Sequence, residues 1–492
     1  MRLRRGVSLR LASPRRASRL AATLACAGLA LALGGCFVGY EKPDAALDIP
    51  PAYRAAARHA DVALPSVHWW RGFRSRQLTD LIEESLTSNL DIQVAIARIV
   101  QADANSRVGG AALLPAIDFN ASGTRSRSSS TTGSTSSSSG PNDRNTFSTS
   151  LSASYEFDFW GKNRAALRAL EETAVATRFD REVVALTTVV SVANAYFQVL
   201  AAYDRLRVAR ENIAAASRVY KLIQERFDAG VASALDTAQQ ESVLNTQRAS
   251  VPPLEQVLRQ NVATLAVLVA RPPQRIAIRA DSMSRIAIPP ITPGIPSDLL
   301  AQRPDIREAE AQLAAANANV ESARAAFFPT ISLTAEGGYQ SNALRTLLRP
   351  DSLFYSLAGG LTQPLLDGLR LKGQLDLQAG RQDEALQLYR RAVLNGFADV
   401  ERALIATQQA AERERLQREV VRSSRLAFEI AERRLREGAV DLITVLNTQQ
   451  TLFQAEDTLA QARLARLLAV VSLFQALGGG WQLPVEDAPF QP

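Results

Sequence analysis

The chain has 492 residues, of which 47% are hydrophobic and 21% charged, and its formal net charge is +7. Residues 1–35 contain seven arginines and no acidic residue, so this segment carries the whole excess and the rest of the chain is close to neutral. Once it is set aside, the charge balance gives no indication of a nucleic-acid-binding protein.

Residues 1–35 have the composition of an export signal. A basic region is followed by an apolar region from Leu20 to Leu33, which is too short to span a bilayer. It ends at Leu33-Gly34-Gly35-Cys36, which resembles a bacterial lipoprotein signal box. We therefore expect residues 1–35 to be removed and Cys36 to be acylated. The alternative is an ordinary secretory signal in which the cysteine occurs by chance.

Cysteine usage agrees with a lipid anchor. The only other cysteine, Cys26, would leave with the signal, so the mature chain could form no internal disulfide. Several acyl chains, each contributing about 0.8 kcal/mol per buried methylene, would hold the protein firmly in a membrane. Phe37 follows Cys36 in place of the aspartate that resembles an inner-membrane retention signal, which favours the outer membrane.

The chain contains a long internal duplication. Residues 91–123 match residues 305–337 at 13 of 33 positions, seven of them alanine. Gly161 recurs as Gly368, and the Arg226–Gly230 segment recurs as Arg434–Gly438. A period near 210 residues is too long for a solenoid, whose repeats span about 20–50 residues. The duplication predicts two equivalent halves of one larger symmetric object.

Each half contains a predicted β-hairpin, at about 116–160 and about 330–364. Apolar and polar residues alternate there over four segments of roughly 10–13 residues. This length suits a tilted membrane strand of about 9–11 residues, with aromatic side chains toward lipid and polar ones toward a wet interior. The Ser/Thr/Gly tract from Ser126 to Gly140 predicts a long exposed loop. A soluble antiparallel sheet packed on helices is the alternative.

The remaining sequence predicts very long helices. Residues 162–229 include neither glycine nor proline, which allows about 100 Å of helix at about 1.5 Å per residue. No proline occurs between Leu365 and Leu483. Gly230 and Gly438 lie where a left-handed residue would end one long helix before the chain returns. Pro252-Pro253 should break or bend the returning helix of the first half only.

Four membrane strands cannot exist alone. Open strand edges in lipid leave backbone groups unsatisfied, and the smallest membrane barrels have about eight strands. The chain must therefore oligomerise. A trimer would supply 12 strands and repeat the long helices with near-sixfold symmetry. The predicted fold class is mainly α with transmembrane β.

This layout resembles the outer-membrane efflux proteins, the OprM, NodT and TolC group. The resemblance covers nearly all of the mature chain and depends on the order and spacing of several short motifs. These are the signal box with Cys36-Phe37-Val38-Gly39-Tyr40, Arg303-Pro304-Asp305-Ile306, Phe327-Phe328-Pro329, Arg226-Phe227-Asp228-Ala229-Gly230 with Leu235-Asp236, Gly438-Ala439-Val440-Asp441 with Leu446-Asn447, and Ala476-Leu477-Gly478-Gly479-Gly480-Trp481.

The resemblance implies a homotrimer with a 12-stranded outer-membrane β-barrel continued by a 12-helix periplasmic α-barrel. It implies a gated exit channel for drugs or other toxic small molecules, served by a periplasmic membrane-fusion adaptor and an inner-membrane RND-type pump, without cofactor, metal or nucleic acid. The expected divisions are the signal 1–35, a lipid-anchored arm and equatorial segment 36–90, a first repeat 91–290, a second repeat 291–477 and a tail 478–492.

The candidate site residues lie at the two helix tips. Asp441 would form an anionic ring by threefold symmetry, although tip residues are often merely solvated; Asp236 is a second candidate. Leu442 is a candidate for an apolar constriction, with burial in the core as the alternative. Arg434, Arg436 and Arg226 either tie the tips shut or serve as helix C-terminal cations. The expected adaptor-docking positions are Gly230, Ser233, Gly438 and Val440.

No catalytic constellation is present in the sequence. Both histidines, His59 and His68, lie in the N-terminal arm, no Cys/His spacing suits a metal, and no glycine-rich loop follows a strand. We therefore expect a protein that is not an enzyme. Two rival functions are a lipid-anchored scaffold built from coiled coils and a passive nutrient porin. The porin would have no need of such long helices.

Overall fold

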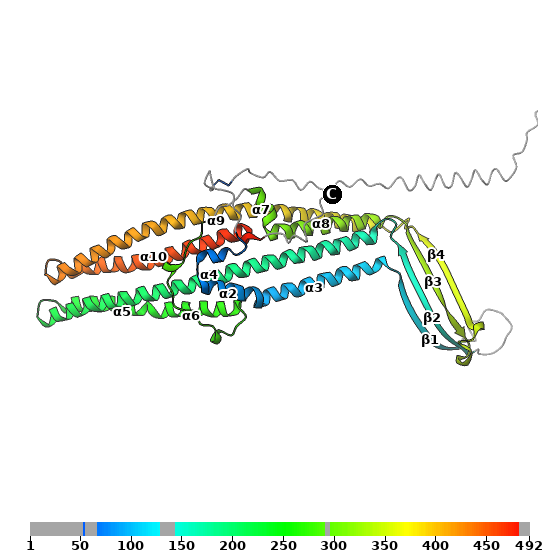
Figure 1. Cartoon of the computed structure of the whole chain (residues 1–492), viewed down its shortest axis with the longest axis horizontal. Coiled ribbons are helices and arrows are strands. Elements are labelled where there is room, and N and C mark those ends of the chain that lie inside the picture. The colour runs from blue at the N-terminus through cyan, green and yellow to red at the C-terminus, as the bar shows by residue number, and fades with distance from the viewer. Residues whose placement is uncertain (1–52, 55–65, 128–142, 291–295, 482–492) are drawn as a thin grey trace, which may run out of the picture. The chain divides into compact units, whose positions relative to one another are not determined.

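The structure is a computed structural model that describes residues 53–54, 66–127, 143–290 and 296–481 (Figure 1). Cys36 and Cys26 lie outside these residues. The described chain is mainly helical with four antiparallel strands, which confirms the predicted fold class. Seven short 3-10 helices occur in it, at Trp69–Phe73, Ala111–Leu113, Pro273–Arg275, Met283–Arg285, Leu344–Thr346, Pro350–Ser352 and Gly478–Gly480.

The four strands form one sheet in the order β1-β2-β3-β4. Their bounds are β1 Ala116–Arg127, β2 Asp143–Phe157, β3 Thr330–Ser341 and β4 Leu353–Thr362. The duplicated hairpins are thus joined by pairing between β2 and β3, which brings the two repeats side by side. Among the described strands, β1 and β4 each have one unpaired edge, so the sheet is open on both sides.

The strand register separates an apolar face from a polar face. One row across the sheet aligns Phe119 with Leu151, Gly337 and Tyr355. The adjacent row aligns Asp118 with Ser152, Glu336 and Ser356 on the opposite face. Further large apolar side chains on the first face are exposed, namely Ile117, Phe157, Leu333, Leu353, Leu357 and Leu361. An apolar exposed face opposite a polar one is the pattern of a membrane strand.

Two unbroken helices of 67 residues carry the chain away from the sheet. They are α4 Lys162–Asp228 and α9 Arg370–Arg436. Each helix begins shortly after a strand and ends at a tip, and each spans about 100 Å at about 1.5 Å per residue. The absence of glycine and proline explains the continuity of α4, whereas α9 continues through three glycines.

The returning helices differ between the repeats. The second repeat returns in one helix, α10 Leu442–Ala476, whereas the first returns in two, α5 Ala234–Ala249 and α6 Val251–Leu268. The break at Ser250 comes directly before Pro252-Pro253, and prolines fit the first turn of α6 because its N–H groups need no partner in that helix. The difference expected from the two prolines is present.

Shorter helices flank the long ones. They are α2 Arg76–Ser88, α3 Leu90–Gly110, α7 Pro296–Gln302 and α8 Pro304–Ala325. In sequence, α3 leads into β1 and α8 leads into β3. α3 packs on α4, while α8 packs on both α4 and α9 (Figure 1).

The main core lies where the arm, the first repeat and α10 meet. Phe73 packs edge to face on Phe197 at 5.0 Å, and Trp69 stacks on Phe474 at 4.7 Å. A second cluster, which we call the tip cluster, lies toward the ends of the long helices. It consists of Ala215, Ala216, Val219, Ile223, Leu244, Phe428, Ala431, Leu435, Leu442, Val445, Leu452 and Phe453. Both repeats contribute to each cluster, so the repeats do not fold as separate modules.

Three glycines after α10 form a buried left-handed turn. Gly478, Gly479 and Gly480 have φ of +79°, +63° and +74°, and all three are buried. A Cβ on Gly478 would overlap the Gln302 carbonyl oxygen. Residues 478–480, expected to begin a tail, therefore belong to the packed structure because only glycine fits this turn against α7.

We expect Gly478→Ala to lower the free energy of unfolding by about 3 kcal/mol, because it combines a left-handed alanine with a backbone clash. Thermal unfolding of the purified protein measures the effect. The matched control is Gly373→Ala in the first turn of α9, where no heavy atom lies within 4 Å of the added Cβ. A wild-type melting midpoint for Gly478→Ala would contradict this account.

Candidate functional site: the helix tips

The two long helices end in the same backbone motif. At the first tip, Gly230 has φ +74°, its N–H donates to the Phe227 carbonyl at 2.9 Å, and Val231 N–H donates to the Arg226 carbonyl at 2.9 Å. At the second tip, Gly438 has φ +73° and donates to Leu435 at 3.1 Å. These are Schellman motifs, in which the left-handed residue satisfies the last carbonyls of the helix. The left-handed conformation expected at both glycines is present.

The returning helices begin with caps built from the same two groups in exchanged positions. In the first repeat, Ser233 caps α5: its hydroxyl accepts from Asp236 N–H at 3.2 Å, and the Asp236 carboxylate accepts from Ser233 N–H at 2.8 Å. In the second repeat, the carboxylate comes first. Asp441 caps α10 and accepts from Thr444 N–H at 3.0 Å and from its hydroxyl at 2.5 Å. Both arrangements satisfy otherwise unpaired N–H groups at a helix start.

Asp441 is therefore both a structural cap and a surface charge. Its side chain is exposed. The hydroxyl and the backbone N–H of Thr444 hold the pKa of Asp441 below its usual range, because both donate to the ionised carboxylate. Asp236 is half-buried and lies within the first cap. Each cap thus contains one carboxylate, and the two carboxylates lie three positions apart when the repeats are aligned.

One arginine links the two tips. Arg226 Nη1 donates to the Leu435 carbonyl at 2.5 Å, which joins the last turn of α4 to the last turn of α9. Arg436 instead pairs with Glu432 one turn earlier on its own helix, and the Arg434 side chain is exposed. Of the three tip arginines, Arg226 is the one that the structure connects across the repeats.

Leu442 lies in the tip cluster and is only 7% exposed, and Val440 packs against the same cluster. This corrects the expectation that Leu442 lines an apolar constriction: its side chain fills the space between helix pairs, the alternative role. Sequence reasoning missed four apolar side chains that are exposed beside the tips. They are Phe227, Val231, Leu235 and Ile443. Their positions in the sequence, next to the tip glycines and cap residues, could have indicated that they lie at the tips.

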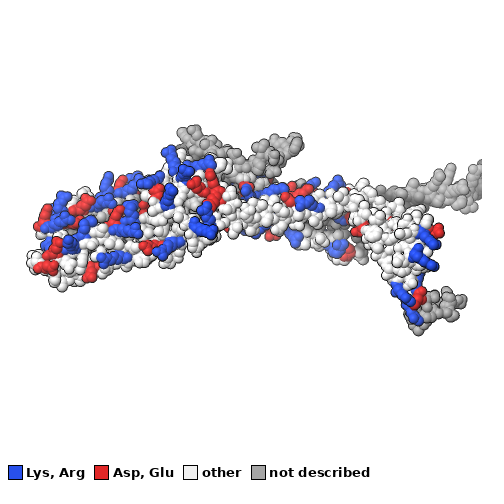
Figure 2. All heavy atoms as spheres, turned by 60° about the horizontal axis from the view of Figure 1, so that its bottom comes forward, with Lys and Arg blue, Asp and Glu red and all other residues white. Residues whose placement is uncertain are grey.

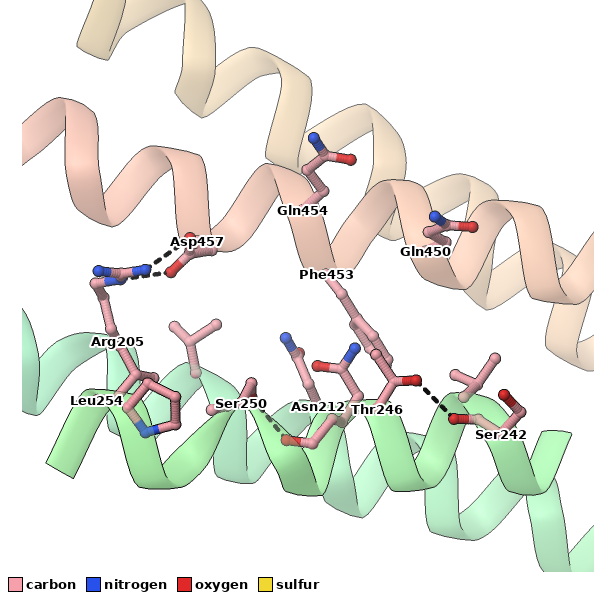
Figure 3. A pocket seen from close by; sticks show the side chains of 15 residues that line it. Arg205, Asn212, Ser242, Thr246, Ser250, Leu254, Gln450, Phe453, Gln454 and Asp457 are labelled. Carbon is pink, nitrogen blue, oxygen red and sulfur yellow. Dashed lines mark hydrogen bonds and ion pairs between the residues drawn. The ribbon is translucent and has the colours of Figure 1, made fainter. Parts of the chain in front are cut away.

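Behind the tips, the helix pairs are joined by polar contacts across a seam. The fully buried amides of Gln240 and Gln449 approach to 3.3 Å, and Arg205 holds Asp457 through two hydrogen bonds of 2.6 and 3.2 Å. Between these contacts lies a groove of about 640 Å³ beside the α5–α6 break (Figure 3). Amide and hydroxyl groups line much of it, including Asn212 and Thr246. Nothing in this lining provides a nucleophile with an adjacent base.

Within the described ranges, no group of three or more His, Cys, Asp or Glu side chains is placed to hold a metal ion.

The family model described as outer membrane efflux protein matches residues 81–271 and 295–479, more than half of the chain. The chain belongs to the outer membrane efflux protein family. The predicted resemblance is therefore confirmed. Family membership makes the chain a transport protein rather than an enzyme.

Similar proteins in this family extend over almost the whole chain. The pyoverdine export outer membrane protein OpmQ of Pseudomonas putida is 40% identical, over 88% of this chain and 92% of its own. A probable efflux pump outer membrane protein, TtgC of Pseudomonas putida, is 32% identical over 93% of this chain and 95% of its own. The cation efflux system protein CusC of Escherichia coli is 30% identical over 92% of this chain and 98% of its own.

A solved structure of CusC superimposes with a TM-score of 0.80 at 27% identity, covering 89% of this chain and 98% of the CusC chain. CusC changes conformation as it folds and forms a transmembrane channel. Together with the family match, this similarity identifies the chain as an outer-membrane channel of efflux systems.

Proposed function

We propose that three copies of the chain close into a gated tunnel that conducts drugs or other toxic small molecules from the periplasm to the exterior. The observation that carries the proposal is the match between the open sides of the protomer. The sheet has free edges at β1 and β4, and the helices that adjoin those strands in sequence, α3 and α9, expose apolar side chains. Three four-stranded sheets would give the 12 strands of a closed membrane barrel.

The exposed apolar side chains form a stripe along each of these helices. The α3 stripe is Leu90, Val94 and Val108, and the α9 stripe is Leu394, Ile405, Leu416 and Ile430. The α9 residues recur at about three or four helical turns, so they lie on one face, opposite the buried residues Val400, Val421 and Phe428. In a head-to-tail contact, the α9 side of one copy would face the other open side of the next copy, which is α3 near the sheet and α5 and α6 toward the tip. The side chains of Leu235, Val257 and Val267 are exposed on α5 and α6. Such a contact closes into a ring.

The charge distribution supports a periplasmic position for the helices. Lysine, arginine, aspartate and glutamate crowd the part of the helices toward the tips, whereas the surface leading to the sheet is largely uncharged (Figure 2). We infer that the sheet lies in the outer membrane and the tips lie deep in the periplasm, where the exposed tip residues dock a membrane-fusion adaptor fed by an RND-type inner-membrane pump. The docking positions are Gly230, Ser233, Gly438 and Val440, with the apolar side chains beside them.

Reconstitution of the purified protein in planar lipid bilayers tests the channel. We expect uniform conductance steps from trimers. Long helical monomers that never conduct would instead support the scaffold function. For the cargo, loss of the gene should raise sensitivity to drugs across chemical classes. Because OpmQ is named for pyoverdine export and CusC for cation efflux, export of pyoverdine and tolerance to cations belong in the same assay.

The periplasmic gate is proposed at the tip carboxylates, with Asp441 as the main group and Asp236 as the second. Arg226 holds the two tips together, and Arg434 and Arg436 add positive charge at the end of α9. Three copies of Asp441 would form an anionic ring that retains cations and resists permeation through a narrow opening.

We expect Asp441→Asn to raise single-channel conductance on the order of twofold, because it removes the ring charge. Asparagine keeps the helix cap, whereas Asp441→Ala removes both cap and charge, so a change shared by both variants reports the charge. Since the pKa of Asp441 is held low, its carboxylate should stay ionised as pH falls through the usual carboxylate range. The wild-type current should therefore approach that of Asp441→Asn only below this range. Equal currents at neutral pH would exclude Asp441 from the gate.

We also propose that the mature chain begins at an acylated Cys36. Mass spectrometry of the mature N-terminus should show acyl chains on the wild-type protein and none on Cys36→Ala. An unmodified wild-type cysteine would exclude the anchor. The channel proposal does not depend on this result, because the strands alone would retain the protein in the membrane.

A further inference from the structure

The segment that connects the two repeats, residues 270–290, is fixed to the surface of α4 and α6. Its apolar side chains point inward: Met283 is fully buried, and Ile278 and Ile286 are 8% and 7% exposed. Its backbone is held by α4, because Tyr203 donates to the Ile278 carbonyl at 3.1 Å and the Asp204 carboxylate accepts from Met283 N–H at 2.9 Å. The segment is therefore an anchored surface and not a loose loop.

Arginines occupy the outward positions of this segment. Arg271, Arg275, Arg279 and Arg285 are all exposed, against a single acid, Asp281. Arg271 pairs with Glu84, and Arg285 pairs with Asp281 at 3.3 Å. Within the part of the chain that the structure describes, Arg275 and Arg279 form no ion pair. Two guanidinium groups are thus left uncompensated on a rigid support.

A hollow of about 810 Å³ adjoins the segment between α4 and α6. Arg207, Arg210, Arg259 and Arg285 line it. Its acids are already engaged: Asp204 binds Arg207 and Met283 N–H, Glu255 lies 3.9 Å from Arg259, and Asp281 binds Arg285. Arg210 is exposed and, among the described residues, has no acidic partner. We call residues 270–290 together with Arg210 the arginine platform.

The platform lies far from both ends of the helices. Tyr203 and Asp204, which hold it, are about 60 Å along α4 from its start beside the sheet, and the tip is about 35 Å further on. Lipid headgroups at the sheet are therefore out of reach, and so is an adaptor seated on the tips. An anionic partner for this surface has to be a component of the layer that the helices cross.

We propose that the arginine platform binds the carboxylate-bearing stem peptides of cell-wall peptidoglycan, which stands between the membranes that the tunnel connects. This inference rests on the proposed periplasmic position of the helices. Guanidinium groups bind carboxylates through two parallel hydrogen bonds, and the wall repeats its carboxylates along a polymer. Each exposed ion pair contributes little alone, so stable attachment depends on several arginines per copy and three copies per channel acting on one polymer.

Co-sedimentation with purified peptidoglycan sacculi tests the proposal. The detergent-purified full-length protein should pellet with sacculi at low salt and be released at high salt, because the contacts are exposed and screened. The triple variant Arg210→Gln, Arg275→Gln, Arg279→Gln should pellet at least about fivefold less, because three uncompensated charges per copy are lost. The matched control removes three exposed arginines from α9, Arg413→Gln, Arg422→Gln and Arg433→Gln, and should pellet like the wild type.

Three results would overturn the proposal: no wild-type sedimentation, equal loss in both triple variants, or binding to phosphatidylglycerol vesicles without binding to sacculi. The platform variant should keep wild-type conductance in planar bilayers, since none of its three residues belongs to the gate. Loss of wall binding with normal conductance supports the platform. A wild-type protein that conducts but never pellets contradicts the platform alone and leaves the channel proposal standing.

Discussion

Replacing Ile405 with glutamate should convert the trimer into monomers and abolish conductance while leaving the helices of each copy folded. Ile405 is 48% exposed in the single chain and lies in the middle of the α9 stripe, between Leu394 and Leu416. In the proposed ring, this side chain is covered by a neighbouring copy. A carboxylate there would lose its water without gaining a partner, which costs several kcal/mol per contact, and the ring has three such contacts.

The free-energy change decides the outcome. Each 1.4 kcal/mol shifts an association equilibrium about tenfold, so several kcal/mol at every contact exceeds what a modest rise in protein concentration could offset. Native mass spectrometry in detergent gives the oligomeric state, and circular dichroism reports the helix content of the same sample. Loss of trimers together with loss of helix would indicate misfolding and would not test the contact between copies.

Leu344→Glu is the matched control. Leu344 is 67% exposed and lies in the connection between β3 and β4, away from both stripes. The chemistry of the substitution is the same, so its trimer content should equal that of the wild type. Stable conducting trimers of Ile405→Glu would show that the α9 stripe is not the contact between copies.

Regular periodicity made much of the architecture accessible from the sequence. Alternation identified the strands because successive side chains in a strand face opposite ways, as in Ile117 and Asp118. The run without glycine or proline predicted α4 as one helix, and the duplicated glycines Gly230 and Gly438 marked the ends of both long helices. Pro252-Pro253 indicated the break between α5 and α6. All of these signals are local, and so they can be read without knowing which segments meet.

Contacts between distant segments left little trace in the sequence. The pairing of β2 with β3 joins two strands from different repeats, and neither hairpin pattern specifies it. The bond from Arg226 to the Leu435 carbonyl ends on a backbone oxygen, which every residue possesses. The exchange of cap residues was partly visible, since Ser233 and Asp441 align. The role of Thr444 as the donor to Asp441 can be assigned only once the start of α10 is known.

Arg303 shows the same limit at a buried site. Its motif supported the family resemblance, but nothing local to it indicated that its guanidinium joins three helical segments. Burial alone would lower the pKa of Arg303, but hydrogen bonds and charge from Asp305 and Asp399 outweigh burial and raise it. The side chain is 11% exposed and binds Asp305 at 2.6 and 2.9 Å, Asp399 at 3.4 Å and the Ala476 carbonyl at 3.1 Å. It thereby ties the start of α8 to α9 and to the end of α10.

We therefore expect Arg303→Met to lower the free energy of unfolding by about 3 kcal/mol, because Asp305 and the Ala476 carbonyl lose their donor and Asp399 loses the more buried of its two guanidinium partners. Methionine fills a similar volume, so the loss reflects the missing charge and hydrogen bonds more than a cavity. The melting midpoint of the purified protein measures it. Arg402→Met is the control: Arg402 also pairs with Asp399, at 3.5 Å, but its side chain is 72% exposed, and we expect a loss of less than about 1 kcal/mol.

A further substitution separates the charge imbalance from the lost connection. Adding Asp399→Asn to Arg303→Met removes a half-buried carboxylate that keeps only the exposed Arg402 as a partner and should recover part of the stability, because an amide tolerates partial burial better than a weakly paired charge. Full recovery is not expected, since the bonds to Asp305 and Ala476 remain absent. If Arg303→Met and Arg402→Met have the same melting midpoint, Arg303 contributes no more than an ordinary surface ion pair. The junction of α8, α9 and α10 must then be held by its apolar contacts alone.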